Sequence, residues 1–195
     1  KKMLSYEESL KILKETNALI DGHFILSSGL HSTQYVQCAQ LLSKPDKASK
    51  ICTSLAEKIQ STYREFDLIL SPAMGGIVIG YEIGKLLSKE TIFAERVNKN
   101  FVLRRDFKIK KGQKVLIVED VITTGKSSHE CANLVTQCEG LVIGYACIID
   151  RTQKKSILKD KIISQVVLDI PTYSEDNLPE SLSSIKAVKP GSRNL

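Results

Sequence analysis

The chain has 195 residues, 42% hydrophobic and 26% charged, a length and balance that suit one soluble globular domain and argue against a disordered or fibrous chain. Its formal net charge of +6 favours anionic small molecules, and the scattered lysines and arginines argue against nucleic acid as a partner. No hydrophobic run approaches the ~20 residues that span a bilayer, and no secretory segment begins the chain, so we expect no membrane partner.

Helical and strand patterns alternate along the chain. Ser5 and Glu8 form a capping box, and Pro45 suits a first helical position. The expected elements are a helix over 6–19, an irregular segment over 21–43, a helix over 45–62, a strand over 67–70, a helix over 75–87, strands over 91–94 and 114–119, a helix over 126–138, and strands over 141–149 and 166–168. Residues 97–112 are polar and basic, which indicates a mobile loop or an exposed hairpin.

This alternation predicts a single α/β domain over residues 1–195, with a mainly parallel twisted sheet and helices on both faces. Ligands of such sheets bind beyond the carboxyl ends of the strands. Three turns are expected at those ends, at residues 71–76, 119–127 and 150–151.

The most informative segment is 114–128, KVLIVEDVITTGKSS. Four hydrophobic residues run into Glu119 and Asp120, and two hydroxyls and a glycine follow before a segment that suits a helix. The pattern predicts a buried strand, an acidic pair and a tight turn onto a helix N-terminus, where backbone N–H groups and the helix dipole favour an anion. A phosphate fits the turn and sugar hydroxyls fit the carboxylates, so the segment indicates a phosphorylated-sugar site.

Other interpretations of this segment are weaker. Residues 124–127 read TGKS and end like a P-loop, but that motif requires glycine at position 120, where Asp120 would repel phosphates. A dinucleotide site is disfavoured because no GxGxxG follows any strand. The acidic pair alone would also suit a helix N-terminus without a ligand.

Residues 118–127, VEDVITTGKS, resemble the signature of type I phosphoribosyltransferases, which bind phosphoribosyl pyrophosphate (PRPP). Further segments resemble the orotate phosphoribosyltransferases in a short-loop, bacterial-type form: DGHFILSSGLHS at 21–32, SPAMGGI at 71–77, AER at 94–96, LRR at 103–105, IDR at 149–151 and KPGSR at 189–193. The resemblance implies the type I phosphoribosyltransferase fold, with a small hood from residues 20–43 and the C-terminal region, and a mobile loop at about 97–112.

The same resemblance implies an activity. The phosphoribosyl group of PRPP would be transferred to orotate, giving orotidine 5′-monophosphate and pyrophosphate in de novo pyrimidine (UMP) biosynthesis. Mg²⁺ would be carried by PRPP rather than by direct protein ligands, as suits an ion that keeps its waters. The resemblance also implies a homodimer.

Site residues follow from the same resemblance. Glu119 and Asp120 would accept hydrogen bonds from the ribose hydroxyls, because ionised carboxylates are acceptors only, and would stabilise positive charge at C1. Val121 and Ile122 would anchor the turn within the PRPP site. The other expected PRPP contacts are Arg96, Ala73, Met74, Gly75, Gly76, Thr123, Thr124, Gly125, Lys126 and Ser127.

Lys99 or Arg104 would meet the departing pyrophosphate, within one protomer or across the dimer. Lys99, Arg104 and the neighbouring Arg105 could instead be solvated or structural charges, as could Arg96. Arg151 would bind orotate through its planar guanidinium. The remaining orotate contacts are expected from Thr123, Phe24, Ser27 and Ser28. Many relatives carry lysine where this chain has Ser27, and some carry lysine where it has Gly75.

The five cysteines are odd in number, lack CxxC spacing and mostly lie in hydrophobic segments. We expect buried thiols rather than metal ligands or nucleophiles, and a reducing, cytoplasmic location.

Two alternative functions remain open at this point. One is a purine-base phosphoribosyltransferase of salvage. The other is a PRPP-sensing regulator without turnover, which should have an added DNA-binding domain or lack base-recognition residues. The chain has no room for such a domain and retains Arg151, so we expect an enzyme.

Overall fold

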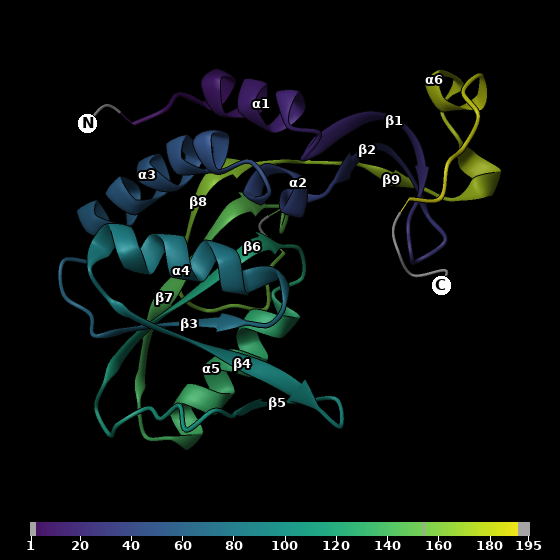
Figure 1. Cartoon of the computed structure of the whole chain (residues 1–195). Helices are drawn as coiled ribbons and strands as arrows, with labels where there is room; N and C mark the ends of the chain where they lie inside the picture. The colour runs from purple at the N-terminus through teal and green to yellow at the C-terminus, as the bar shows by residue number, and fades with distance from the viewer. Residues whose placement is uncertain (1–2, 154, 191–195) are drawn as a thin grey trace.

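The computed structural model describes residues 3–153 and 155–190. A six-stranded sheet forms its centre, in the order β5-β4-β3-β6-β7-β8, and every neighbouring pair is parallel except the β4–β5 hairpin (Figure 1). The strands are β3 (Leu68–Pro72), β4 (Glu90–Val97), β5 (Asn100–Leu103), β6 (Lys114–Ile122), β7 (Leu141–Asp150) and β8 (Ile162–Val167). The predicted mainly parallel sheet is confirmed, with most strands longer than their patterns indicated.

Helices cover both faces of this sheet, as predicted. The helices α1 (Tyr6–Glu15), α2 (Cys38–Leu42), α3 (Pro45–Thr62) and α4 (Gly75–Leu87) lie on one face, and α5 (Lys126–Gln137) lies on the other (Figure 1). Alternate side chains of β6 enter the two cores: Leu116 and Val118 pack under α3 and α4, whereas Val115 and Ile117 pack under α5. Because residues 115–118 of β6 are buried on both faces, this part of the strand is continuously hydrophobic.

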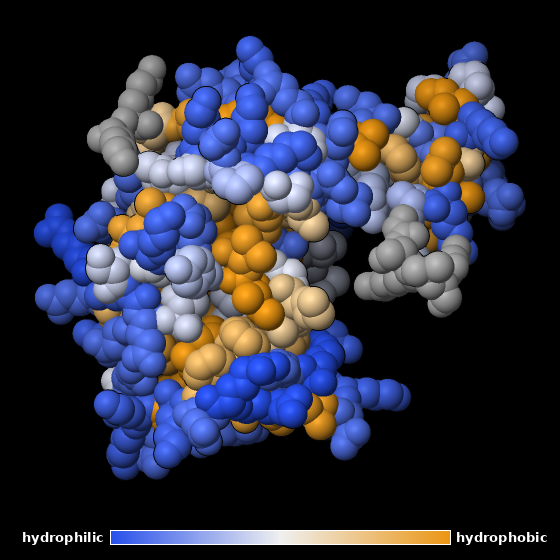
Figure 2. Space-filling view, in the orientation of Figure 1, coloured by the Kyte–Doolittle hydropathy of each residue, from blue (hydrophilic) through white to orange (hydrophobic). Residues whose placement is uncertain are grey.

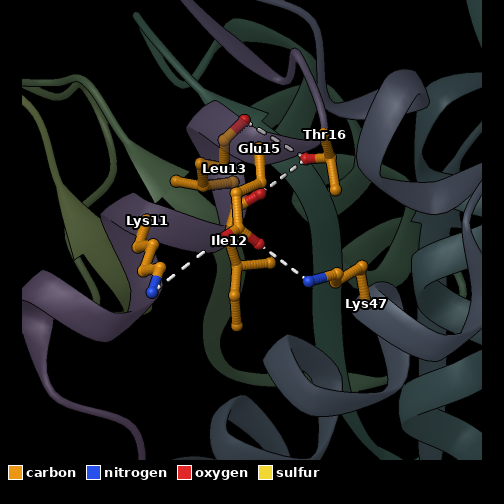
Figure 3. A network of polar contacts seen from close by, with 6 residues as sticks. All are labelled: Lys11, Ile12, Leu13, Glu15, Thr16 and Lys47. Atoms are coloured by element: carbon orange, nitrogen blue, oxygen red, sulfur yellow. Dashed lines mark hydrogen bonds and ion pairs between the residues drawn. The ribbon is translucent and has the colours of Figure 1, made fainter.

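The capping box predicted at the start of α1 is confirmed. The helix ends at Glu15, earlier than expected, because Asn17 takes a positive φ of 60° before the next strand begins. Figure 3 shows this end: the Lys47 ammonium of α3 lies 2.7 Å from the Glu15 carboxylate, and the Thr16 hydroxyl donates to the Ile12 carbonyl at 2.8 Å. The ion pair joins α1 to α3, whereas the hydrogen bond closes the last turn of α1.

The expectation that residues 21–43 are irregular is wrong. The segment contributes β1 (Leu19–Ile25) and β2 (His31–Val36), which form an antiparallel sheet with β9 (Thr172–Tyr173), and then α2. A bulge between Asp21 and Phe24 breaks the alternation of buried and exposed side chains, so the pattern of a strand was hidden. The third strand comes from a distant part of the chain, which local patterns do not report.

The C-terminal segment completes this smaller sheet. After β9 come a short 3₁₀ helix, η1 (Glu175–Asn177), and α6 (Glu180–Ser183). Val188 then pairs with β1: its N–H donates to the His23 carbonyl at 2.9 Å, and its carbonyl accepts from the Ile25 N–H at 2.8 Å. Residues 191–193 of the KPGSR segment lie outside the described residues. The unit formed by β1, β2, β9, η1 and α6 extends from one end of the molecule (Figure 1) and is called the hood below.

Residues 97–103 form the exposed hairpin that was one of two expectations for this region. Val97 pairs with Asn100, and the two residues between them, Asn98 and Lys99, have positive φ values of 50° and 69°. Such values are typical of a two-residue type I′ turn, in which asparagine is favoured. Lys99 therefore lies at the tip of the β4–β5 hairpin. Among all described residues, no helix is long and hydrophobic enough to cross a membrane.

Candidate active site

The strand, turn and helix predicted for residues 114–128 are confirmed. β6 ends at Ile122, Gly125 takes a φ of +84° at the N-cap position, and α5 begins at Lys126. The turn encloses a cavity of about 150 Å³. Its lining residues are Glu119, Val121, Ile122, Thr123, Thr124, Gly125, Lys126 and Ser127. Eight of the residues expected to bind PRPP thus surround one space at a helix N-terminus, which suits a phosphate.

The acidic pair is largely buried beside this turn. Burial raises the pKa of Glu119 to about 7, a hydrogen bond from the Ser128 hydroxyl lowers it, and the neighbouring Asp120 charge raises it. Burial also raises the pKa of Asp120, opposed by the Val121 N–H, which donates to its carboxylate at 2.9 Å. Both carboxylates are poorly solvated, so a ligand that offers hydroxyl donors would gain strong hydrogen bonds there.

The turn after β3 lies against the acidic pair, as the expected convergence of strand ends required. β3 and β6 are parallel neighbours, and a Cβ added at Gly75 would lie 3.1 and 3.2 Å from the two Asp120 carboxylate oxygens. The Ala73 N–H donates to the Ala94 carbonyl at 2.8 Å, which ties this turn to β4. Met74 is 84% exposed at the start of α4. A side chain at position 75 would therefore crowd the Asp120 carboxylate.

A larger cavity of about 630 Å³ adjoins the turn. Its lining residues are Ile25, Leu26, Ser27, Ser28, Tyr35, Gln37, Thr123, Thr124, Arg151, Thr172 and Pro190. Thr123 and Thr124 line both cavities, so the two spaces meet at these hydroxyls. The hood contributes one wall of the larger cavity, and the ends of β6 and β7 contribute the other.

Arg151 is held at the end of β7. Its backbone N–H donates to the Ile122 carbonyl at 2.8 Å, and burial lowers the pKa of its guanidinium from the ordinary value. Phe24, expected beside the base, is buried, and its ring lies 5.7 Å from that of Tyr35, which lines the cavity. Ser27 and Ser28 line the cavity from the turn between β1 and β2.

The expected cations lie around the β4–β5 hairpin. Arg96 lies 2.6 Å from the Glu130 carboxylate of α5 and donates to the Lys99 carbonyl at 2.7 Å. Arg104 lies 3.7 Å from Glu95, a carboxylate that also accepts two hydrogen bonds from the neighbouring Arg105, at 3.0 and 3.1 Å. Arg96, Lys99 and Arg104 are not among the described residues that line either cavity. The structure therefore does not place these three cations on the walls of the two cavities.

Some lining residues were not predicted. Gln37 follows β2, whereas Thr172 and Pro190 come from the C-terminal segment. Strand pairing between His31 and Tyr173 brings that segment to the cavity, and no local pattern reports such pairing. Ser128 was also missed as a site residue, although it follows the motif directly and its hydroxyl bonds Glu119.

Comparisons with known proteins identify the family. The family model described as the phosphoribosyl transferase domain matches residues 39–175. An orotate phosphoribosyltransferase of Parvibaculum lavamentivorans is 42% identical over 193 residues, which cover 98% of this chain and 100% of that protein.

Solved structures show the same fold. The orotate phosphoribosyltransferase from Aeropyrum pernix superimposes with a TM-score of 0.72 at 25% identity, covering 81% of this chain and 92% of that one. An adenine phosphoribosyltransferase from Thermoanaerobacter pseudethanolicus, with a TM-score of 0.60 at 21% identity over 69% of this chain and 88% of that one, is similar in fold alone. With its signature turn, its sheet and its full-length relative, this chain belongs to the phosphoribosyltransferase family.

Proposed function

We propose that the chain transfers the phosphoribosyl group of PRPP to orotate, giving orotidine 5′-monophosphate and pyrophosphate in pyrimidine biosynthesis. One observation carries the proposal: Thr123 and Thr124 line both a small cavity at a helix N-terminus and a larger one that contains Arg151. A sugar phosphate seated in the first would present its C1 to a base in the second. Full-length identity of 42% to an orotate phosphoribosyltransferase supports orotate as that base.

The PRPP side of the site would be built from the turn after β6. The 5-phosphate would accept hydrogen bonds from the Thr123, Thr124 and Ser127 hydroxyls and from backbone N–H groups of the turn, with Lys126 adding charge. Glu119 and Asp120 would accept from the ribose hydroxyls. The turn formed by Ala73, Met74, Gly75 and Gly76 would carry the pyrophosphate.

On the base side, Arg151 would pair with the carboxylate or a carbonyl oxygen of orotate through parallel hydrogen bonds. Its partial burial strengthens that pairing, because less water competes for the guanidinium. Tyr35 offers a ring for the planar base, and the Ser27 and Ser28 hydroxyls at the hood turn would donate to its oxygens.

In the transfer, a ring nitrogen of orotate loses its proton and forms a bond to C1 as the bond from C1 to the pyrophosphate oxygen breaks; the electron pair leaves with pyrophosphate, which takes up the proton directly or through water. Positive charge develops on the ribose ring, next to the two carboxylates of Glu119 and Asp120, which stabilise it. Lys99, at the hairpin tip, is our first candidate to neutralise the pyrophosphate, since Arg104 is already paired with Glu95. Arg96, on the same hairpin, is paired with Glu130 at 2.6 Å and is a second candidate.

Mg²⁺ fits this chemistry as part of the substrate. Among residues 3–153 and 155–190, no three His, Cys, Asp or Glu side chains are grouped to hold a metal ion. Mg²⁺ in phosphate sites keeps several waters and binds substrate oxygens. When bound through PRPP, the ion would neutralise the departing pyrophosphate.

A homodimer in the cytoplasm is the assembly and location that we propose. Part of the outer surface over α4 is hydrophobic (Figure 2), and Met74 is 84%, Val78 54% and Tyr81 67% exposed; such a surface is typical of a protein interface. All five cysteines are free, which suits a reducing compartment.

The test measures the release of pyrophosphate from PRPP in the presence of Mg²⁺. Orotate, uracil, adenine, guanine and hypoxanthine are each supplied separately as the base. We expect turnover with orotate alone. Turnover with a purine and none with orotate would make the chain a salvage enzyme. Tight PRPP binding without turnover of any base would make it a PRPP sensor.

A further inference from the structure

Ser128 is a buried hydroxyl that the proposed chemistry has not yet used. It lies in the first turn of α5, with no exposed surface, and its Oγ donates a hydrogen bond to Oε2 of Glu119 at the end of β6. The bond joins the helix that begins the phosphate turn to the carboxylate that would hold the ribose. A serine inside a helix usually bonds its own backbone or solvent, so this outward bond requires an explanation.

We propose that Ser128 is a positioning residue for the transfer: it holds one oxygen of Glu119, turns the other toward the sugar, and keeps the carboxylate ionised. The proposal rests on the proposed function of the site. Glu119 lines the small cavity, so its position sets where the ribose hydroxyls can bind. Oε2 already accepts a hydrogen bond from Ser128, so Oε1 keeps both of its lone pairs for the substrate.

The surroundings of Glu119 favour its protonated form, and the hydrogen bond from Ser128 opposes them. Burial and the Asp120 charge both favour the protonated form and raise the pKa of Glu119 to about 7, and the hydrogen bond from Ser128 opposes them. The thiols of Cys131 on α5 and Cys147 on β7 also face Glu119, and burial raises the pKa of both, so they stay neutral near pH 7. Ser128 is thus the neighbour that favours the ionised carboxylate.

A cation on the neighbouring hairpin does not replace it. Arg96 of β4 approaches Cys131, but its guanidinium is paired with Glu130 of α5 at 2.6 Å. Removing the Ser128 hydroxyl would leave Glu119 without a hydrogen-bond donor from α5 and would release its side chain. A protonated or misplaced Glu119 would lose its hydrogen bond from the ribose hydroxyl and its stabilisation of charge at C1.

The first measurement is a carboxyl ¹³C NMR titration of Glu119 in the free protein, with and without Ser128→Ala. We expect the variant to titrate at higher pH than the parent. The second is the pH profile of kcat/KM for PRPP with orotate. We expect its acidic limb to move upward, so that kcat/KM falls about tenfold at pH 7 and returns toward the parent value at pH 9.

Three further variants separate positioning from a merely structural role. Ser128→Thr, which keeps the hydroxyl, should restore the profile, and Ser128→Cys, which is similar in size but a poor donor, should behave like Ser128→Ala. Thr136→Ala is the matched control, because it removes an α5 hydroxyl that bonds only its own helix, at 3.1 Å from the Ala132 carbonyl. We expect it to leave the profile unchanged.

Two results would overturn the proposal: an unchanged Glu119 titration in Ser128→Ala, or an equal loss of kcat/KM at every pH. If Ser128→Ala fails to fold, Ser128→Cys supplies the same comparison. If the parent protein does not use orotate, the proposed function fails, but the NMR titration still decides whether Ser128 controls Glu119.

Discussion

Glu119 and Asp120 carry an electrostatic cost in the free protein. Both are largely buried at a strand end, and burial raises the pKa of each. A residue chosen for stability alone at this position would be neutral, because a buried carboxylate loses its hydration. The cost is explained if the site is built for the bound sugar, whose hydroxyls supply the missing donors and whose C1 gains positive charge in the transfer.

We therefore expect Asp120→Asn to reduce kcat by about 10²–10³-fold, since it removes charge from beside C1. The melting temperature should be unchanged or slightly raised, because an amide is cheaper to bury than a carboxylate. Steady-state kinetics and thermal melts check both outcomes. Asp46→Asn, at an exposed carboxylate on α3, is the control and should change neither. A variant of Asp120 with normal kcat would remove the acidic pair from the mechanism.

Glu119 should also make folding stability depend on pH. Its pKa is about 7 in the native state and 4.5 as the ordinary value, so the native state binds more protons between these pH values. Stability is then highest below about 4.5 and falls as pH rises through 7, by on the order of 3 kcal/mol. Urea unfolding at several pH values should show this loss in the parent and a smaller one in Glu119→Gln. Equal losses in both proteins would contradict the assignment.

At the scale of elements, α4 shows how one helix serves both the fold and the site. A Cβ at Gly80 would collide with the Ser71 hydroxyl of β3, whereas a Cβ at Gly75 would only crowd the Asp120 carboxylate. The first glycine lets the helix pack closely on the sheet, and the second leaves room beside the ribose site.

The same substitution at these two positions should have different effects. We expect Gly75→Ala to raise the KM for PRPP about tenfold with a nearly normal melting temperature, because it displaces Asp120. Gly80→Ala should instead lower the free energy of unfolding by about 1–3 kcal/mol through overpacking. Kinetics and urea denaturation distinguish them. A Gly75→Ala protein that binds PRPP normally would show that the contact with Asp120 is irrelevant to the substrate.

Substitutions in the β4–β5 hairpin test which of its cations meets the departing pyrophosphate. Lys99 lies at its tip, and Arg104 is paired with Glu95. Lys99→Ala should lower kcat at least tenfold if this ammonium meets pyrophosphate, whereas Arg104→Ala should have a smaller effect because Arg105 still holds Glu95. Lys108→Ala, an exposed lysine of the same basic segment, is the control. The reverse order of effects would assign the role to Arg104.

Elements with regular patterns could be predicted from the sequence, and irregular ones could not. The strand at 114–122 is buried on both faces, so its hydrophobic run, acidic pair and turn are contiguous and local. The hood strands have no such local, contiguous pattern. A bulge interrupts β1, and the third strand, β9, is brought in by tertiary pairing with β2. The same distinction holds for the site. The contiguous residues of the turn after β6 were predicted together, whereas Thr172 and Pro190, which tertiary pairing brings to the cavity, were not predicted.

At the scale of the whole molecule, the α/β class followed from alternation alone, but the placement of cations did not. The sequence lists Arg96, Lys99 and Arg104 as candidates without saying which are paired. In the structure Arg96 forms an ion pair with Glu130, and Arg104 forms one with Glu95. Such pairing depends on long side chains and on packing between β4 and α5, which no spacing in the sequence reports.

The assembly offers a further test at this scale. If the hydrophobic surface over α4 is the dimer interface, Tyr81→Glu should convert the dimer to a monomer in sedimentation velocity, because it places a charge in a desolvated contact. Tyr6→Glu, at an exposed tyrosine of α1, should leave the dimer intact. A dimeric Tyr81→Glu protein would place the interface elsewhere.

The central claim is that one turn binds the sugar phosphate while the acidic pair binds the ribose and the hood covers the base. A crystal structure with orotidine 5′-monophosphate tests it most directly. We expect the phosphate within hydrogen-bond distance of residues 123–127, the ribose hydroxyls on Glu119 and Asp120, and the orotate ring beside Arg151. A nucleotide bound with its phosphate away from that turn, or with its ribose hydroxyls away from both carboxylates, would contradict the claim.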